Sequence, residues 1–572
     1  MNDSKNLILA VALSALVLIG WTWAANRWFP AANPPSTKVE AGKQQPLPQP
    51  GTQPAGPAAP KQLQSVAAAL SSGSRVRIQT PSLSGSINLK GAQIDDLVLL
   101  NHRQTIAKDS RPVRLLSPVG TPGAYFAQFG WVGSGATQVP ALDSVWTADG
   151  YQLSPHRPVS LTTQTADGTR YQVKISIDDG YLFTVQQSVV NTSQQPIAMR
   201  PIGLVSRAGP SADPHDRSTW QNHTGPIGVF GGKANYSVNW KDLDQGTPES
   251  FTTDSGWLGF TDKYWLTALA PQAGMTGEFR RSPSGGYQGD YALGTATVAP
   301  GQTLTTQTRL FAGAKEKSWL DRYEEAGIPK LSKSIDWGWF EWFMRPIFSL
   351  LLFLFHATGN FGVAIICLTL IVRAIMFPIA QKQFQSMAAM RKIQPKMKAL
   401  QERFKDDKQR QQQEILKLYQ AEKINPAAGC LPILLQIPVF YALYKVLLVS
   451  VEMRHQPFIL WIKDLSAPDP LSPLNLFGYA PWTLPTFLAI GVLPIMVGAT
   501  QWLSMKLNPQ PMDPAQAQVF AIMPWFLVFI MAPFAAGLQL YWMTNNLLTI
   551  AQQWWLYRKY GLHFSDTHPV HT

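Results

Sequence analysis

The sequence contains little cysteine and little charge. Only two of its 572 residues are cysteines, Cys367 and Cys430, and both lie in apolar segments, so no disulfide framework supports the polar part of the chain. Only 15% of the residues are charged, whereas 45% are hydrophobic. This balance is typical of a membrane protein, or of a chain that joins membrane and soluble parts.

Several catalytic motifs are also missing. The chain has no GxxxxGK[ST] phosphate loop, no HExxH motif and no CxxC pair, so ATP hydrolysis and zinc chemistry have no support. The histidines of the polar part are scattered and form no spaced group with carboxylates: His102, His156, His215 and His223. We therefore expect no catalytic residues, no metal site and no cofactor, and we expect that the protein is not an enzyme.

The N-terminal segment 1–26 contains an apolar run from Asn6 to Ala25. A cleaved signal peptide would have an apolar core of about 7–15 residues that ends in a small-residue cleavage site. This run is longer, and Trp21 and Trp23 occupy that place, as interfacial aromatic residues would. We interpret it as an uncleaved signal-anchor helix. The following segment, 27–65, contains nine prolines and predicts an extended linker.

Residues 66–325 have the pattern of an all-β domain. Short runs alternate apolar and polar residues and are separated by Gly, Pro, Asn and Asp, as at 75–80, 86–91, 171–177 and 181–190. Many short strands with turn signals and few helical stretches predict a large β-sandwich.

The second half of the chain is apolar. Residues 333–358 mix tryptophans with a few charges and predict an interfacial amphipathic helix, with the start of a long spanning helix as the alternative. We expect a second span at 361–378, four more spans with short loops in 429–556, and a short tail at 557–572. With the N-terminal anchor this makes six spans, of which five form the core. The apolar stretch 361–377 is shorter than a hydrocarbon core of about 30 Å, which favours local bilayer thinning.

The segment 379–425 is basic and has a helical apolar pattern that Asp406 and Asp407 interrupt. It predicts a helical hairpin, and the excess of positive charge places it in the cytoplasm, with both chain termini on the same side and the β domain outside. Its candidate binding residues are Arg391, Lys392, Lys396, Lys398, Arg403 and Lys408. The hairpin could dock RNA, protein or lipid headgroups, or it could be a solvated hairpin that sets orientation only.

A positive charge stands inside the second span, at Arg373, with Thr369 one turn earlier. A charge at mid-membrane costs about 2.5–3.5 kcal/mol on insertion scales. Either the side chain snorkels to the cytoplasmic surface, or it faces a wet cavity between helices. The last span is unusually polar and includes Tyr541 and Asn546, and Gln436 belongs to the third span. Because lipid offers such groups no partners, we expect them to line a hydrophilic groove.

No acid lies inside any predicted span, so the partner of Arg373 could be part of another chain that enters the membrane. A membrane transporter remains an alternative, although the chain shows neither repeated helix pairs nor intramembrane acids. An outward-facing carbohydrate-binding protein or enzyme is another, although it would need paired carboxylates or histidines in the β domain.

Several long motifs in a fixed order then carry a resemblance that runs nearly from end to end. They are TDKYW (261–265), IDWGWF (335–340), the run that ends at Arg373, INPAAGCLPILLQIPVF (424–440), PFILWIKDLSAPDP (457–470), KLNPQPMDP (506–514) and LQLYWMTNNLLTIAQQ (538–553). With these motifs the chain resembles the YidC family of bacterial membrane-protein insertases, of the Gram-negative type.

The resemblance implies an insertase and foldase of the bacterial inner membrane that works alone or with the Sec translocon. It implies nascent membrane proteins, the ribosome, signal-recognition components and membrane lipids as partners, and no specific DNA. Arg373 and Thr369 match groove positions of the family, and Ile437 and Pro438 match substrate-contacting positions. Trp542 stands where the family usually has a second tyrosine after Tyr541. The β domain resembles sugar-binding supersandwich folds.

Overall fold

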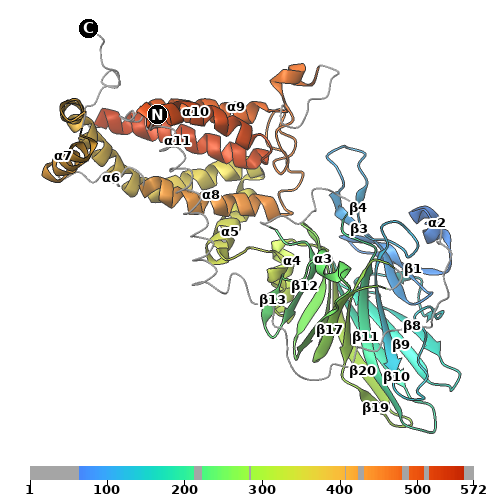
Figure 1. Cartoon of the computed structure of the whole chain (residues 1–572). Coiled ribbons are helices and arrows are strands. Elements are labelled where there is room, and N and C mark those ends of the chain that lie inside the picture. The colour runs from blue at the N-terminus through green and yellow to red at the C-terminus, as the bar shows by residue number, and fades with distance from the viewer. Residues whose placement is uncertain are drawn as a thin grey trace. The chain divides into compact units, whose positions relative to one another are not determined.

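The computed structural model describes residues 63–211, 222–282, 285–405, 407–422, 431–479, 489–507 and 514–559. The predicted N-terminal anchor and almost all of the predicted linker lie outside these residues. The chain divides into two compact units, Met1–Trp339 and Phe340–Thr572, which are described separately (Figure 1).

The first unit is built from two large sheets, as the alternating sequence pattern predicts. In chain order, the strands of the first sheet are β1 (Arg75–Gln79), β2 (Leu83–Asn88), β3 (Gln93–Arg103), β4 (Pro112–Leu116), β5 (Tyr125–Gly133), β7 (Gln152–Leu153), β11 (Ile197–Arg207), β14 (Glu249–Thr253), β17 (Met275–Arg281), β18 (Tyr287–Leu293) and β19 (Ala296–Val298). Its pairings are antiparallel apart from the parallel pair β1–β7.

The second sheet has the order β13-β12-β15-β16-β20-β10-β9-β8-β6. Its strands are β6 (Thr147–Ala148), β8 (Val159–Gln164), β9 (Arg170–Ile177), β10 (Leu182–Val190), β12 (Gly225–Phe230), β13 (Lys233–Asn235), β15 (Gly256–Thr261), β16 (Trp265–Pro271) and β20 (Thr303–Ala314). Side chains alternate between buried and less buried along β9 and β10, as expected for strands with one face on a core. The two sheets touch where Gln187 of β10 donates hydrogen bonds to the carbonyls of Gly130 and Ile202.

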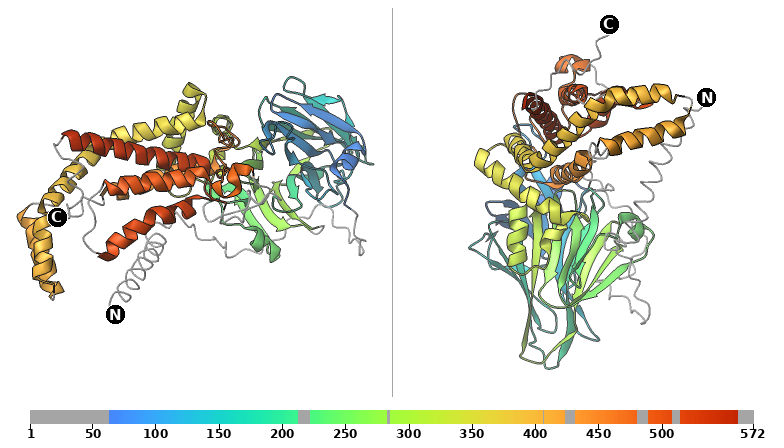
Figure 2. Two further views of the ribbon diagram at one scale, coloured as in Figure 1. Left: turned by 90° about the horizontal axis from the view of Figure 1, so that it is seen from above. Right: turned by 90° about the vertical axis from the view of Figure 1, so that its left-hand side faces the viewer.

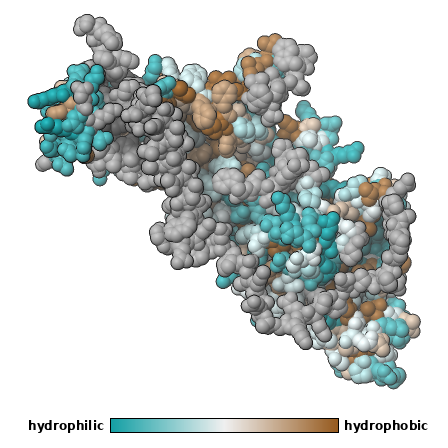
Figure 3. All heavy atoms as spheres, viewed as in Figure 1, coloured by the Kyte–Doolittle hydropathy of each residue, from teal (hydrophilic) through white to brown (hydrophobic). Residues whose placement is uncertain are grey.

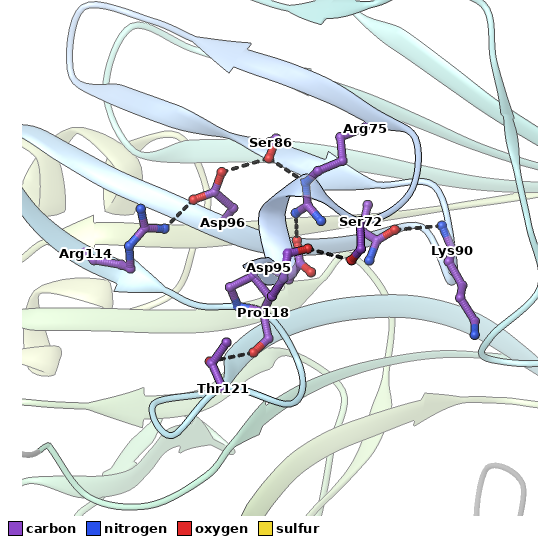
Figure 4. A network of polar contacts seen from close by, with 11 residues as sticks. Ser72, Arg75, Ser86, Lys90, Asp95, Asp96, Arg114, Pro118 and Thr121 are labelled. Atoms are coloured by element: carbon purple, nitrogen blue, oxygen red, sulfur yellow. Dashed lines mark hydrogen bonds and ion pairs between the residues drawn. The ribbon is translucent and has the colours of Figure 1, made fainter. Parts of the chain in front are cut away.

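A network of ion pairs and hydrogen bonds near one edge of the first sheet connects the four strands β1, β2, β3 and β4 (Figure 4). Arg75 pairs with Asp95, Arg114 pairs with Asp96, and Ser86 donates to Asp96 over 2.7 Å while it accepts from Arg75 Nε over 2.8 Å. Burial raises the pKa of Asp95, which Arg75 partly offsets. Because both neighbouring carboxylates form ion pairs with arginines of other strands, β1 and β4, we interpret them as structural residues of the sheet.

Short helices complete this unit: α2 (Val66–Ser71), α3 (Trp240–Asp244) and α4 (Lys317–Glu325). The 3₁₀ turn η3 (Leu331–Ser334) follows, and residues 335–339 are not helical. Asp336 accepts hydrogen bonds from the backbone of His223 and Gly338, and Gly338 is left-handed with φ +70°. The prediction of one helix over 333–358 is therefore wrong at its start: α5 begins at Glu341 and ends at Thr358.

The second unit is helical, with the helices side by side in two views (Figures 1 and 2). After α5 it contains α6 (Phe361–Arg403), α7 (Lys408–Ala421), α8 (Leu431–Val449), η5 (Pro473–Gly478), α9 (Val492–Lys506), α10 (Pro514–Met531) and α11 (Ala536–Lys559). Helix α11 packs against α6, α8 and α9, and α10 packs against α9.

Two expected boundaries are wrong. The span at 361–378 and the hairpin at 379–425 share one continuous helix, α6, which runs through Pro378 and Pro395. A proline removes one backbone hydrogen bond, and a membrane helix tolerates it where neighbouring groups satisfy the freed carbonyl. Helix α11 also continues to Lys559, past the expected start of the tail at 557.

Among the described residues, one helical stretch is long and apolar enough to cross a membrane, Phe361–Lys382, with 22 residues. At 1.5 Å per residue it measures about 33 Å, so residues beyond 378 extend this span to the thickness of a hydrocarbon core, and its length does not support local thinning. Two shorter apolar stretches are Gln436–Val449 and Gln518–Met531. The total of six spans stays a prediction.

Candidate functional site: a polar cluster around helix α11

Helix α11 presents polar side chains on two adjacent faces. Tyr541, Asn545 and Thr549 recur every four residues and so lie on one side of the helix. Trp542 and Asn546 lie one residue further on, about 100° around the helix axis. The first set contacts α6 and α8, and the second set contacts α9, so the cluster connects α11 to three other helices.

The first face receives Arg373 from α6. Its Nε donates to Asn545 Oδ1 over 2.8 Å, and its Nη2 donates to the carbonyl of Asn545 over 3.1 Å and to the hydroxyl of Thr549. Thr549 donates in turn to the carbonyl of Asn545 over 2.8 Å. The partners of the guanidinium are thus neutral oxygens.

The charge of Arg373 is hydrogen-bonded but not neutralised. No carboxylate of the described residues forms an ion pair with Arg373, and its Nη1 makes no hydrogen bond with them. The residue is partly exposed, so the side chain is neither sealed in the bundle nor directed away from it.

The same face of α11 receives α8. Gln436 donates a hydrogen bond from Nε2 to the hydroxyl of the buried Tyr541. Ile437, the next residue, is 57% exposed and faces outward, and Pro438 lies inside α8 and is half-buried. The structure therefore joins Gln436 to the cluster and leaves Ile437 on the helix surface beside it.

The second face of α11 contacts α9. Trp542 Nε1 donates to Gln501 Oε1 over 3.3 Å, and Asn546 Nδ2 donates to Thr500 Oγ1 over 3.2 Å. The ring of Trp542 also meets Phe440 of α8 edge to face, with 4.8 Å between the ring centroids. Trp542 is thus held by α8 and α9 through an aromatic contact and an indole hydrogen bond.

Thr369 lies one turn before Arg373 on α6 and is buried. Its hydroxyl donates to the carbonyl of Ile365 over 2.6 Å, within its own helix. Its hydroxyl is therefore used locally, and its role in a groove stays a prediction.

The predicted hairpin consists of the end of α6 and α7, and Asp407 caps α7 by accepting from the backbone of Arg410 over 3.0 Å. Lys396 forms an exposed ion pair with Glu422 over 2.6 Å, and Arg403 lies over the ring of Phe404. The side chains of Arg391, Lys392, Lys398 and Lys408 lie outside the described residues, so their roles stay predictions.

Sequence reasoning misses two residues of the site, Thr500 and Gln501. It predicts Asn545 and Thr549 only as polar residues of the last span that line the protein interior, because nothing in the sequence pairs them with Arg373. Their four-residue spacing from Tyr541 is the signal that places them on one face. Thr500 and Gln501 are an adjacent polar pair in an apolar helix, which is a comparable signal.

The loop between α8 and α9 closes one end of the helical unit. Asp469 Oδ2 accepts from the backbone of Leu493 in the first turn of α9 over 2.7 Å, where Gly491 has no side chain to cap the helix. The carbonyls of Leu465 and Ala467 accept from Gly537 and Ala536 at the start of α11, over 2.9 and 2.8 Å. The loop thereby satisfies amide groups that a helix N-terminus leaves without partners.

A β-rich domain joined to an apolar helical unit with a polar cluster around an arginine is the architecture of a multi-domain membrane protein, and two family models match the same two parts. Residues 75–350 match the YidC periplasmic domain, and residues 353–562 match the 60Kd inner membrane protein family.

Curated relatives match almost the whole chain. The membrane protein insertase YidC of Zymomonas mobilis is 45% identical over 98% of this chain and 96% of its own length. That of Methylorubrum extorquens is 43% identical, with the same coverage. A crystal structure of an active YidC insertase covers 84% of this chain and 92% of its own, at 19% identity and a TM-score of 0.36. The chain belongs to the YidC family of membrane protein insertases.

This membership confirms the resemblance found in the sequence. The protein is an inner-membrane protein with a periplasmic β-rich domain. The relatives are insertases, whose activity is not a catalytic one, so the expectation that the protein is not an enzyme is confirmed.

Proposed function

We propose that this insertase draws a polar segment of a nascent membrane protein into the membrane with the charge of Arg373, and then releases the adjoining apolar segment into lipid. The observation that supports this is the bonding of Arg373, which has neutral partners on α11 and no counter-ion among the described residues. A charged residue inside a membrane span that has no counter-ion marks a candidate functional site.

In this proposal the polar residues of α6, α8, α9 and α11 line a hydrophilic groove that holds water in the inner half of the bilayer. An acidic segment of the client enters part of the way because it approaches the guanidinium. Gln436, Tyr541, Trp542 and Asn546 border the groove, and Ile437 and Pro438 contact the client. The remaining Nη1 donors of Arg373 are suited to a client carboxylate, because charge-assisted hydrogen bonds are the strong ones.

The client's apolar segment then leaves along α8 and α10. Helix α10 carries exposed apolar side chains that suit such a path: Val519, Phe520, Ile522, Trp525, Phe526 and Phe529. Its apolar part, Gln518–Met531, measures about 21 Å, which is shorter than a hydrocarbon core of about 30 Å and favours thinning beside it. Burial of the client's own apolar surface, at about 25 cal/mol per Å², supplies the driving force, so no nucleotide is required.

Further parts of the proposal rest on the resemblance and on charge. The chain would cross the membrane six times with both termini in the cytoplasm, where the excess of basic residues in 379–425 places the hairpin. The hairpin would meet the ribosome, signal-recognition components or lipid headgroups, and the helical unit would work alone or beside the Sec translocon.

A sugar-processing role of the β domain has less support. Its clustered carboxylates are paired with arginines: Asp95 with Arg75, Asp96 with Arg114, and Asp290 with Arg280. A transporter also has less support, because no intramembrane acid is present in the sequence of the predicted spans.

The proposal is tested with Arg373→Lys and Arg373→Glu in an insertion assay, on two versions of one client that differ only in an acidic or a neutral translocated segment. Lysine should keep much of the insertion of the acidic client, and glutamate should abolish it. Equal insertion of the acidic client by both variants would remove charge attraction from the mechanism. Crosslinking from position 373 to a stalled nascent chain shows whether the client reaches the cluster.

A further inference from the structure

In the loop between α8 and α9, residues 450–479, both aspartates are turned inward. Asp469 is 5% exposed, and its Oδ1 accepts from Trp461 Nε1 and from the backbone of Leu471, each over 3.0 Å. Asp464 Oδ1 accepts from the backbone of His455 over 3.2 Å and from both the backbone and the hydroxyl of Ser466, over 2.8 and 2.6 Å. Donors of the loop and of α9 hydrogen-bond these two carboxylates, which leaves them little contact with water.

The large apolar side chains of the same loop point outward. Leu460 is 75% exposed, Leu476 58% and Phe477 52%. All three have left-handed backbones, with φ of 55°, 52° and 59°. That conformation costs a residue with a side chain about 1–3 kcal/mol, and it persists only where the surroundings impose it. A loop that faced water would gain nothing from strain that exposes leucine and phenylalanine, so the arrangement is suited to an apolar medium.

The place of the loop in the helical unit identifies that medium. Asn360 Nδ2 donates to the carbonyl of Phe458 over 3.2 Å, and the Phe458 ring lies directly against Gly362, so the loop sits at the start of α6. The chain reaches this point directly after the periplasmic domain and α5. The loop therefore lies where α6, the helix that follows α5, enters the membrane.

Apolar surface continues from the loop into the helices. Ile495 and Met496, in the first turns of α9, are 39% and 40% exposed. Hydrophobic atoms gather over α9 and α10 on the face of the molecule drawn in Figure 3. The loop tips thus extend a surface that faces lipid in an inner-membrane protein.

We propose that the α8–α9 loop is a lipid-binding element that inserts Leu460, Leu476 and Phe477 into the periplasmic leaflet of the membrane. The occupant is the boundary between headgroups and acyl chains, into which apolar side chains reach about 5–10 Å. The buried carboxylates keep negative charge away from the lipid. The bond from Leu493 to Asp469 holds the loop on the start of α9, and the carbonyls of Leu465 and Ala467 hold it on the start of α11. This inference requires the membrane location of the protein and not the role of Arg373.

The test measures depth in the membrane with spin labels. Leu460→Cys and Phe477→Cys are made in full-length protein whose two native cysteines are replaced by alanine, and each is reconstituted into vesicles of phosphatidylethanolamine and phosphatidylglycerol. Collision with oxygen, which concentrates in lipid, is compared with collision with a water-soluble nickel chelate. Ile522→Cys, on the exposed face of α10, is the lipid reference, and Lys174→Cys, exposed on β9, is the aqueous reference.

Both loop labels should resemble Ile522 in favouring oxygen over the chelate. Labels that favour the chelate, as at Lys174, would overturn the proposal, because the loop would then lie in water. Labels that neither reagent reaches would overturn it as well, because a protein contact would cover the loop. All the labelled side chains are exposed, so loss of folding is not expected, and the thermal unfolding of each variant is compared with that of the unlabelled protein.

Discussion

Replacing Asn545 with aspartate gives Arg373 an internal counter-ion at almost no change in side-chain volume. The Oδ1 atom that now accepts from Arg373 Nε over 2.8 Å would become part of a carboxylate. If the charge of Arg373 attracts clients, this variant should remove most of that attraction while the helices remain in contact. The change therefore separates the charge of the arginine from its structural role.

The size of the effect follows from the separation of the charges. A client carboxylate that approaches to about 8 Å, at an effective dielectric constant of about 20, gains about 2 kcal/mol from the guanidinium. Because about 1.4 kcal/mol corresponds to a factor of ten, loss of this attraction should slow the insertion of an acidic client about 30-fold. A client with a neutral translocated segment should be nearly unaffected.

The assay is insertion into proteoliposomes of the same paired clients, with protease protection of the translocated segment as the readout. Asn545→Ser is the matched control, because serine keeps a neutral acceptor beside Arg373 and should retain most of the activity. The thermal stability of each variant in detergent shows that the bundle is folded. If folded Asn545→Asp inserts the acidic client as fast as the wild-type protein does, attraction by Arg373 does not drive insertion.

Two further predictions concern the scaffold. Gly491→Ala should lower thermal stability in detergent, because the new Cβ atom would lie 2.6 Å from Cβ of Asp469. This contact would displace the Asp469 side chain, which caps α9 and contributes about 1 kcal/mol. Gly294→Ala is the control, because a Cβ atom there would have no atom beyond its chain neighbours within 4 Å. Burial raises the pKa of Asp290 to about 6, so the folded domain binds its proton more tightly than the unfolded chain. Its contribution to the free energy of unfolding should therefore be greatest below about pH 4 and decline towards pH 6, and urea unfolding at several pH values should show that Asp290→Asn removes this decline; an unchanged decline would contradict the assignment.

The sequence predicts elements better than it predicts their ends. The alternating runs at 171–177 and 181–190 form β9 and β10. Side chains on a strand point to opposite faces in turn, so an apolar residue at every second position indicates a strand with one buried face. The boundary at Pro378 fails because a proline signals a helix end in water, whereas packing and the lipid setting let α6 continue. The boundary at 333 fails because Asp336 and Gly338 form a turn whose hydrogen bonds are not visible in a hydrophobic pattern.

The candidate site shows the same division. The residue types of the cluster are visible in the sequence, since Arg373, Gln436 and Tyr541 are polar groups in apolar helices. Their partners are not visible, because pairing depends on the rotation of each helix about its axis. The bond between Arg373 and Asn545 joins residues 172 positions apart, and only the packing of α6 on α11 brings them together.

The position of Arg373 and its hydrogen bonds favour a place in the polar cluster around α11 over snorkelling to the membrane surface. It is the thirteenth residue of Phe361–Lys382, about 18 Å from the start of that span and about 14 Å from its end, and its Nε and Nη2 donate to α11. Hydrogen bonds to charged groups contribute about 1.5–3 kcal/mol each, so three of them are enough to offset an insertion cost of about 2.5–3.5 kcal/mol. A carboxylate in place of Asn545 would satisfy the guanidinium equally well and would also cancel its charge. With neutral partners the arginine is stabilised and its charge is not cancelled, which is the condition that the proposed attraction of an acidic segment requires.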